Sequence, residues 1–449
     1  MLRSLFVALI IVYGIFQSSR GPFYALMFYL WIAYFRPESW IYSDWFVQLN
    51  LSLIVAGIVL AGTITSGRRL RFGIGPALIL TFFAHALLAT LMSSAPDYAW
   101  PALENFSKSI VIGCLIITLV ESELQLRVTL VVIAASLGFE AVKQGWAQLV
   151  LNPGGTNIND SPFLGDNNGV AVGMFMLAPI VLALARTAPS RFGQLVARFA
   201  AFGIIYRGLS TYSRGGFLAC GALGLQYVAR SKQKFVTLVA IAAVSLLMVA
   251  VLPEAFWGRM GTITEANEEI EGADSSAQGR IYFWRLAVAM ANDHPWVGVG
   301  PEGYKAFFNE YDSFAGGDYG IDRAVHSSWF GVLAEFGYPG LLLFLVIVAR
   351  GLWVCRRARI AAKRDDRMRN LGAFAVGLEG ALIAFVVGGS FISFQYNEMV
   401  WHVLALSVVV DRLVTERSAA LTPAAALAPA PAIRPALKLP AGPRRPIRI

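Results

Sequence analysis

One stretch near the C-terminal end of the chain decides its fold. Residues 326–349 read HSSWFGVLAEFGYPGLLLFLVIVA, and Arg350 follows them directly. The stretch opens with a histidine and two serines and continues as an apolar run, which as a helix is long enough to cross about 30 Å of hydrocarbon. We therefore predict a membrane-spanning helix whose polar boundary lies at His326.

The rest of the composition agrees with this prediction. The chain is 57% hydrophobic and only 14% charged, and its mean hydropathy is +0.60. The first apolar run has no small-residue cleavage site after it, so we expect a retained span and not a signal peptide. The expected fold is an all-α polytopic membrane protein with about 12–13 transmembrane helices. The predicted spans lie near residues 2–17, 22–36, 48–66, 73–94, 106–120, 128–147, 168–186, 195–212, 215–229, 235–252, 327–349, 372–393 and 397–413.

The distribution of basic residues predicts which ends of these spans face the cytoplasm. Short loops rich in Lys and Arg stay on the cytoplasmic side of a membrane. In the predicted topology four such loops fall on one side, which explains the net charge of +9 better than nucleic-acid binding does. The four groups are Arg68, Arg69 and Arg71; Arg186, Arg191 and Arg198; Arg230, Lys232 and Lys234; and Arg356, Arg357, Arg359, Lys363, Arg364, Arg367 and Arg369.

The opposite, periplasmic side carries one long loop, residues 253–325. This loop has 12 acidic and five basic residues, with helix-like stretches around 279–293 and 302–311 and Gly/Asp turns at 316–320. We expect it to form a cap on a transmembrane domain that spans residues 1–417.

Residues 418–449 differ in composition from the rest of the chain. They hold seven prolines, many alanines, five basic residues and no acid, which is typical of a disordered cytoplasmic tail.

Three residues at the periplasmic boundary are candidates for chemistry. Residues 211–216 read TYSRGG, and the planar guanidinium of Arg214 suits a phosphate or diphosphate. Its alternative role is to reach lipid headgroups from the interface. Residues 276–285 read SAQGRIYFWR, where Arg280 begins an amphipathic helix and either binds the ligand or belongs to a surface loop. His326 either accepts a proton from an attacking hydroxyl or caps the helix that follows it.

Seven further residues are candidates for substrate binding: Arg207, Ser213, Asp166, Asn167, Lys143, Tyr304 and Glu335. Asp166 and Asn167 open a span, where they bind sugar hydroxyls or cap the helix. Lys143 lies one helical turn from Glu140, so the two form either an ion pair or part of a cavity.

The other candidates also have two readings. Arg207 lies inside a span and either contacts phosphate or reaches outward to the interface. Tyr304 stacks on a sugar or packs in the loop, and Glu335 binds substrate or ties two helices together.

Several of these motifs resemble a known group of proteins. Three features follow one another along the chain: Ser-Arg-Gly, a large loop that contains an Arg, and His-Ser-x-Trp-x-x-x-Leu-Ala-Glu-x-Gly-x-x-Gly at 326–340. In this order they resemble the O-antigen ligase/polymerase superfamily, over roughly residues 200–395. The upstream motifs GDNNG at 165–169, RPE at 36–38 and EAVKQG at 140–145 resemble the O-glycosylation ligases associated with exosortase systems.

This resemblance implies a class-C-like glycosyltransferase in the bacterial inner membrane, acting in O-glycosylation or in surface polysaccharide assembly such as lipopolysaccharide or exopolysaccharide. It would transfer a preassembled glycan from undecaprenyl diphosphate to an acceptor hydroxyl on the periplasmic side, without a metal or other cofactor. Carried onto this chain, Arg214 and Arg280 would hold the diphosphate, and His326 would act as general base or would position the hydroxyl.

The acceptor and the class of activity remain open at this point. A protein, a lipid A–core sugar and a growing polymer are all possible acceptors, so an O-antigen ligase and an O-antigen polymerase are alternatives. A transporter of lipid-linked glycans is an alternative of another class, and it would be expected to show internal repeats with paired broken helices. The sequence shows no convincing similarity between its halves.

Overall fold

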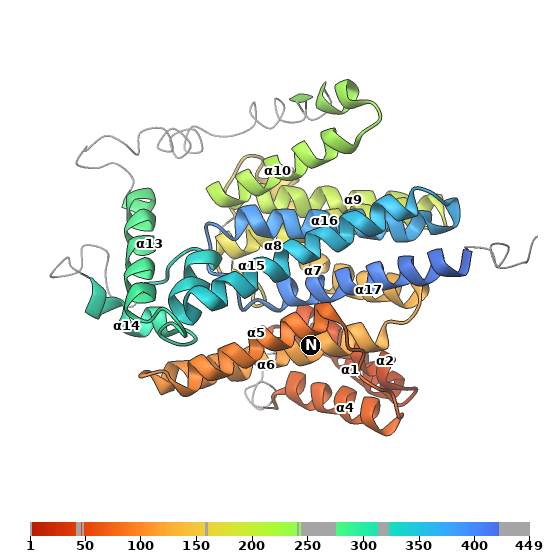
Figure 1. The fold of residues 1–449 in the computed structure, drawn as a ribbon. Helices are drawn as coiled ribbons and strands as arrows, with labels where there is room; N and C mark the ends of the chain where they lie inside the picture. The colour runs from red at the N-terminus through yellow and green to blue at the C-terminus, as the bar shows by residue number, and fades with distance from the viewer. Residues whose placement is uncertain are drawn as a thin grey trace, which may run out of the picture.

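Most of the long helices run roughly parallel or antiparallel to one another, and α13 stands across them (Figure 1). The computed structural model describes residues 2–41, 46, 49–157, 160–239, 242–243, 275–312 and 323–421. The elements of the first half are α1 (Leu2–Ser18), α2 (Pro22–Phe35), the 3-10 helix η1 (Pro37–Ser39), α4 (Leu51–Thr65), α5 (Ile74–Leu91), α6 (Pro96–Leu119) and α7 (Glu123–Leu151). The second half holds α8 (Asn167–Thr187), α9 (Arg191–Leu209), α10 (Arg214–Arg230), α13 (Ser275–Asp293), α14 (Gly303–Tyr311), α15 (Ser328–Ala362), the 3-10 helix η2 (Asp366–Met368), α16 (Arg369–Gly388) and α17 (Glu398–Leu421).

The predicted class, an all-α polytopic membrane protein, is confirmed. Within the described residues six helical segments are long and apolar enough to cross a membrane, and α1, α2 and α4 are shorter apolar helices. The six are α5, α6, α7, α8, α15 and the segment Asp366–Gly388 that contains α16. The predicted span at 235–252 lies mostly outside the described residues.

Several helices are longer than their predicted spans, among them α6, α7, α15 and α17. α6 begins at Pro96, ten residues before the predicted boundary at 106, and α15 continues to Ala362 instead of ending at 349. Part of the predicted basic loop is therefore helical. Arg and Ala, which dominate residues 356–362, are strong helix formers, so a helix continues easily beyond its apolar section.

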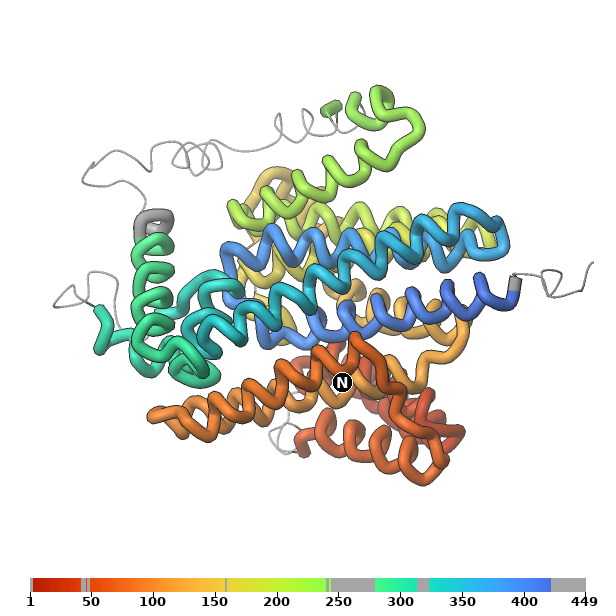
Figure 2. Tube along the Cα trace, viewed as in Figure 1, coloured from red at the N-terminus to blue at the C-terminus, as the bar shows by residue number. Residues whose placement is uncertain are grey.

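The core of the bundle is built around α8. In Figure 2, α10 lies above α15 and α16, α17 lies below these two, and the N-terminal helices lie at the bottom. Of the 18 consecutive residues that form the most apolar part of α8, 89% are buried. Small residues allow the close packing: a Cβ atom on Gly377 of α16 would lie 2.8 Å from the Cβ of Ala183 and 2.9 Å from the Pro179 carbonyl oxygen.

A break in α15 is the docking point for α13 and α14. Gly337 has a left-handed φ of 66°, and Pro339 has no N–H to bond the Glu335 carbonyl. The N–H of Gly300 donates to that carbonyl instead, at 3.0 Å. In the same way the Val299 N–H donates to the carbonyl of Ala334 at 2.9 Å. The loop before α14 thereby donates hydrogen bonds to two carbonyl groups of α15 that the break leaves without a partner in the helix.

The helix-like stretches predicted around 279–293 and 302–311 are confirmed as α13 and α14. They enclose a small apolar core of their own, which includes Phe283, Met290 and Phe308 and reaches Ala334 of α15. We call this end of the bundle the cap end; it lies at the left in Figure 1. The predicted turns at 316–320 lie outside the described residues. α17 ends at Leu421, so residues 418–421 are helical, and the rest of the predicted tail lies outside the described part of the chain.

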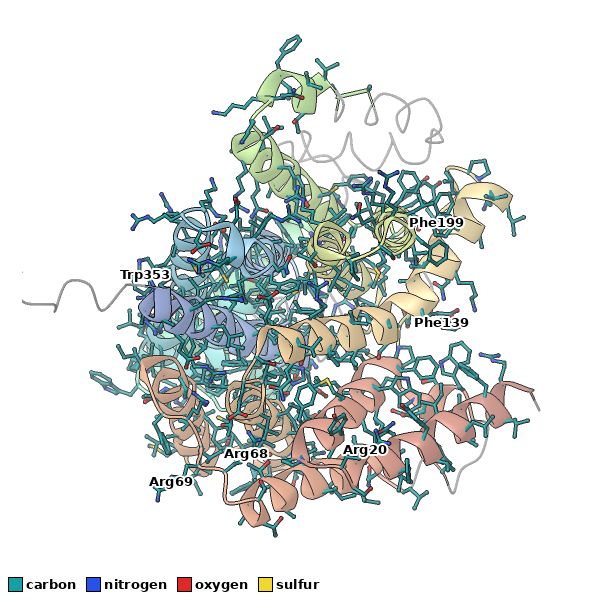
Figure 3. All side chains as sticks on the ribbon, turned by 90° about the vertical axis from the view of Figure 1, so that its right-hand side faces the viewer. Arg20, Arg68, Arg69, Phe139, Phe199 and Trp353 are labelled. Atoms are coloured by element: carbon teal, nitrogen blue, oxygen red, sulfur yellow. The ribbon has the colours of Figure 1, made fainter. Side chains whose placement is uncertain are left out.

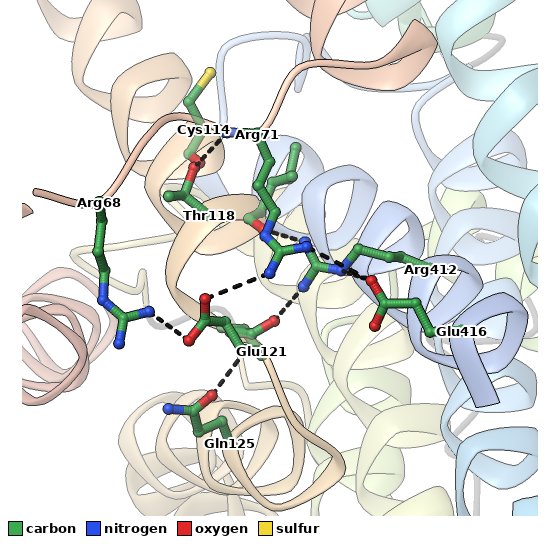
Figure 4. Close-up of polar contacts among 10 residues, drawn as sticks. Arg68, Arg71, Cys114, Thr118, Glu121, Gln125, Arg412 and Glu416 are labelled. Carbon is green, nitrogen blue, oxygen red and sulfur yellow. Dashed lines mark hydrogen bonds and ion pairs between the residues drawn. The ribbon is translucent and has the colours of Figure 1, made fainter. Parts of the chain in front are cut away.

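The basic groups lie at the opposite end, which we call the basic end. Arg68 and Arg71 both pair with Glu121, which lies between α6 and α7, and Arg71 also pairs with Glu416 of α17 at 3.5 Å (Figure 4). Figure 3 faces this end of the bundle, with Arg68 and Arg69 labelled near its edge. Ion pairs therefore tie the loop after α4 to the ends of α6 and α17.

Further contacts bring the fourth basic group to the same end. Glu123, at the start of α7, accepts a hydrogen bond from Asn370 at 2.7 Å and pairs with Arg417 at 2.6 Å. The ends of α8, α10 and α15 and the start of α16 surround one cavity, which brings Arg186, Arg230 and Arg359 together. The predicted basic groups thus share one end of the bundle.

Candidate functional site

Three helices begin at the cap end, and each has a side chain capping its first turn. Asp166 accepts a hydrogen bond from the Gly169 N–H at 2.9 Å at the start of α8. Ser213 and Ser327 cap α10 and α15 in the same way, at 3.3 and 3.4 Å. A helix N-terminus carries a partial positive charge and favours an anion nearby. Three helix N-termini therefore lie on one side of the bundle, and at the start of α8 the Asp166 carboxylate already offsets the partial positive charge.

Side-chain hydrogen bonds join the first two of these ends. The Ser213 hydroxyl donates to the side-chain oxygen of Asn168 at 2.8 Å, and the Asn167 amide donates to the Thr211 carbonyl at 3.3 Å. The predicted candidates Ser213, Asp166 and Asn167 therefore lie together, where α8 and α10 begin.

The third of these helix ends, the start of α15, is hydrogen-bonded to the loop between α16 and α17. The Ser328 N–H donates to the Gly389 carbonyl, and the Ser328 hydroxyl donates to the Ile392 carbonyl, both at 2.8 Å. That hydroxyl also accepts from the Phe394 N–H at 2.9 Å. We call residues 389–397 the α16–α17 loop; its position is fixed by the first turn of α15.

Phe391 of this loop connects α10 with α13. The guanidinium carbon of Arg280 lies 6.0 Å from the centre of the Phe391 ring. On another side, a Cβ atom added to Gly215 would lie only 2.8 Å from the Phe391 Cβ. Gly215 follows Arg214, the first residue of α10, so Phe391 lies between the start of that helix and Arg280 of α13. Each is partly exposed.

His326 lies next to this group. Its φ of 50° is left-handed, which is uncommon and strained for a residue with a side chain, and it directly precedes the capping Ser327. Its ring centre lies 6.1 Å from that of Phe283 in the cap. Burial lowers the pKa of His326, and the nearby Arg280 lowers it further, while Asp166 opposes the shift. Burial and Arg280 therefore both favour the neutral imidazole, the form that can accept a proton.

The charge around His326 is mostly positive. Besides Arg280, Arg323 and Lys305 also act to lower its pKa. Lys305 itself pairs with Glu302 at 2.6 Å. The arrangement can hold an anion beside a neutral base, as the departure of a diphosphate and the attack of a hydroxyl both require.

Two predicted candidates belong to a separate network between α7 and α9. Arg207 is 2% exposed; its Nε donates to Gln144 at 2.8 Å and its Nη1 donates to the Asn157 carbonyl at 3.0 Å. Lys143 pairs with Glu140 at 2.7 Å, so the predicted pair forms. These contacts favour a structural role for Arg207 and Lys143, because both side chains bind other groups of the protein.

Two other candidates are also held by protein groups. Tyr304 is 1% exposed, and its hydroxyl donates to the Phe283 carbonyl at 3.0 Å. The buried Glu335 accepts hydrogen bonds from the Tyr396 hydroxyl at 2.6 Å and from the Gln395 amide at 3.3 Å. Tyr304 therefore packs inside the cap, and Glu335 ties α15 to the α16–α17 loop.

The α16–α17 loop is the part of the site that the sequence did not reveal. Its signal was a polar interruption between two apolar runs, with Ser390, Gln395 and Asn397 close together. Nothing in that interruption indicated that Phe391 would lie against Arg280. Among the described residues, no group of three or more His, Cys, Asp and Glu side chains could hold a metal ion.

Comparison with known families gives two matches. Residues 199–345 match the model of a family described as O-antigen ligase, and residues 1–186 match a family of unknown function. No curated protein matches the chain. The first match contains Arg214, Arg280 and His326. It supports the O-antigen ligase superfamily and a glycan transfer of the ligase or polymerase type.

Proposed function

We propose that this protein is an inner-membrane glycosyltransferase that moves a preassembled glycan from undecaprenyl diphosphate to an acceptor hydroxyl on the periplasmic side. The observation that carries the proposal is that Arg280 lies near His326 and against Phe391, while α10, which begins at Arg214, approaches the same Phe391. All three lie at the cap end, where Phe391 and the first turns of three helices meet.

The reaction needs two things from the protein. The acceptor oxygen attacks the anomeric carbon of the glycan, and the bond from that carbon to the diphosphate oxygen breaks with its electron pair. The products are the glycosylated acceptor and undecaprenyl diphosphate. Arg214 and Arg280, with the helix ends, stabilise the charge that builds on the leaving diphosphate.

His326 supplies the second requirement. The acceptor hydroxyl loses its proton as the new bond forms, and a neutral imidazole accepts it. Burial and the surrounding cations keep His326 neutral before the donor binds. Once the diphosphate lies beside it, the negative charge favours the protonated ring, so donor binding strengthens the base.

The two ends of the bundle support the proposed sidedness. The basic end carries the Lys- and Arg-rich segments that favour the cytoplasm, so the cap end faces the periplasm. A protein hydroxyl is the acceptor we favour, as in the O-glycosylation branch associated with exosortase systems. The support is that the upstream GDNNG motif at 165–169 supplies the α8 cap Asp166 and the Ser213 partner Asn168.

The test uses purified protein in detergent micelles, where there are no compartments to transport between. The donor is an undecaprenyl diphosphate-linked glycan, offered in turn with a Ser/Thr-containing protein acceptor and with lipid A–core. We expect a covalent glycan–protein product by mass spectrometry. A product on lipid A–core alone would replace the proposed acceptor, and longer donor-linked glycans would indicate a polymerase. No covalent product with any acceptor would contradict transfer itself.

A further inference from the structure

A cavity at the basic end has a lining that the glycan-transfer site does not explain. It has a volume of about 510 Å³ and lies among the last turns of α8, α10 and α15 and the first turn of α16. Ser231 and Thr237 contribute hydroxyl groups to its wall. Its cationic lining residues are Arg186, Arg230, Arg359, Lys363 and Arg369.

Few acidic groups balance these cations. Glu379 pairs with Arg230 at 2.5 Å and with Arg359 at 3.1 Å, so one buried carboxylate serves two guanidinium groups. Asp366 is the acidic residue in the lining itself. Five cations therefore face two carboxylates. An excess of positive charge remains at the cavity.

The remaining cations have no acidic partner in the part of the chain that the structure describes. Arg186 lies over the ring of Tyr227, 5.2 Å from its centre, and forms no ion pair there. Lys363 and Arg369 are both exposed and form no ion pair with another described residue. These three side chains can all approach an anion in the cavity.

Helix dipoles account for only part of this arrangement. Arg186, Arg230 and Arg359 lie in the last turns of their helices, where a cation is favourable without any ligand. Arg369 is different because it begins α16, and a cation at a helix N-terminus opposes the dipole. An anion bound between Arg369 and Lys363 removes this conflict.

We propose that this cavity binds the phosphate-bearing headgroup of an anionic phospholipid in the cytoplasmic leaflet. It opens at the end of membrane-spanning helices, and Ala362, Ala373 and Val376 give it an apolar wall beside the cations. Basic pockets between membrane helices are suited to such headgroups. The exposed Trp353, with Arg357 4.9 Å from its ring centre, marks the same end as an interfacial region.

The test measures lipid binding to the full-length protein, purified and depleted of lipid in detergent. Short-chain phosphatidylglycerol, short-chain phosphatidylcholine and inorganic phosphate are each titrated while the Tm is recorded. We expect phosphatidylglycerol to raise the Tm with saturation and the other two to have little effect. The double variant Lys363→Gln/Arg369→Gln should need at least about tenfold more phosphatidylglycerol for the same shift.

The matched control is Arg69→Gln/Arg191→Gln, which removes two exposed cations outside the cavity lining and should respond as the wild type does. If the double variant does not fold, Lys363→Gln alone takes its place. Equal responses of the cavity variant and the wild type would overturn the proposal, as would equal responses to the two lipids. An equal response to inorganic phosphate would show that the occupant is a soluble anion and not a headgroup.

Discussion

The guanidinium carbon of Arg280 lies 6.0 Å from the centre of the Phe391 ring, although the two residues come from the cap and from the loop between α16 and α17. A cation over an aromatic face is attracted to it and loses part of its water. Gly215 approaches the same Phe391 from α10. Phe391 therefore lies between Arg280 and the start of α10, where Arg214 is the first residue.

Removal of Arg280 should affect glycan transfer strongly. We expect Arg280→Ala to lower kcat about 10²–10³-fold, the effect typical of losing one electrostatic stabiliser of a leaving group. Arg280→Lys should retain part of the rate, because charge remains while the planar fork is lost. Arg285→Ala is the matched control, since Arg285 is exposed on the same helix, α13. A comparable loss in both alanine variants would contradict a specific role for Arg280.

Close approach at Gly215 gives a second prediction. A methyl group there would lie 2.8 Å from the Phe391 Cβ, so Gly215→Ala should displace the loop and lower kcat/KM about tenfold or more. Gly221 lies on the same helix with nothing within 4 Å of an added Cβ. Gly221→Ala should therefore keep full activity and leave Tm unchanged or slightly raised. Full activity in Gly215→Ala would show that the position of Phe391 does not matter for transfer.

The Ser213 hydroxyl caps α10 and also donates to Asn168. Ser213→Ala should lower the free energy of unfolding by about 1 kcal/mol through loss of the cap, and it should lower kcat as α8 and α10 separate. Ser190 caps α9 by accepting from the Gly193 N–H at 3.0 Å, which makes Ser190→Ala a control for cap loss alone. Transfer rates and denaturant curves of both variants separate the two effects. Equal activity in the two would assign Ser213 a capping role only.

The pH dependence follows from the lowered pKa of His326. A base must be unprotonated, so kcat/KM should rise with pH through the pKa of the free enzyme and level off above it. Because burial and Arg280 lower that pKa, the midpoint should lie below 6.5, the ordinary value for histidine. The midpoint for kcat should lie at higher pH, since the bound diphosphate favours the protonated ring. A rise in kcat/KM centred above pH 6.5 would contradict the assignment.

Metal independence is a further prediction. In the proposed mechanism, two arginines and the helix N-termini supply the positive charge that a divalent cation would otherwise bring to the diphosphate. We expect EDTA to leave the transfer rate unchanged in protein purified without added metal. Loss of activity that Mg²⁺ restores would show that the arginines are not sufficient.

Much of the fold was predictable because membrane helices follow from apolar run length. The helix starts at Asn167, Arg214 and Ser328 each lie within one residue of the predicted boundary. The end of α15 was not predictable from hydropathy, because a helix continues past its apolar section when the next residues favour helix. Arg207 was ambiguous for a related reason: the sequence shows its depth but not that Gln144 and Asn157 face it. Long-range packing likewise placed Phe391, which no local pattern could indicate.

The most direct test of the account is the rate of glycan transfer by purified His326→Ala protein. The substrates are an undecaprenyl diphosphate-linked glycan and an acceptor that the wild type uses, and the Tm of both proteins is compared first. The account predicts a loss of about 10²–10⁴-fold in kcat, the usual contribution of general base catalysis, with the protein still folded. Transfer by folded His326→Ala protein at the wild-type rate would contradict the central claim.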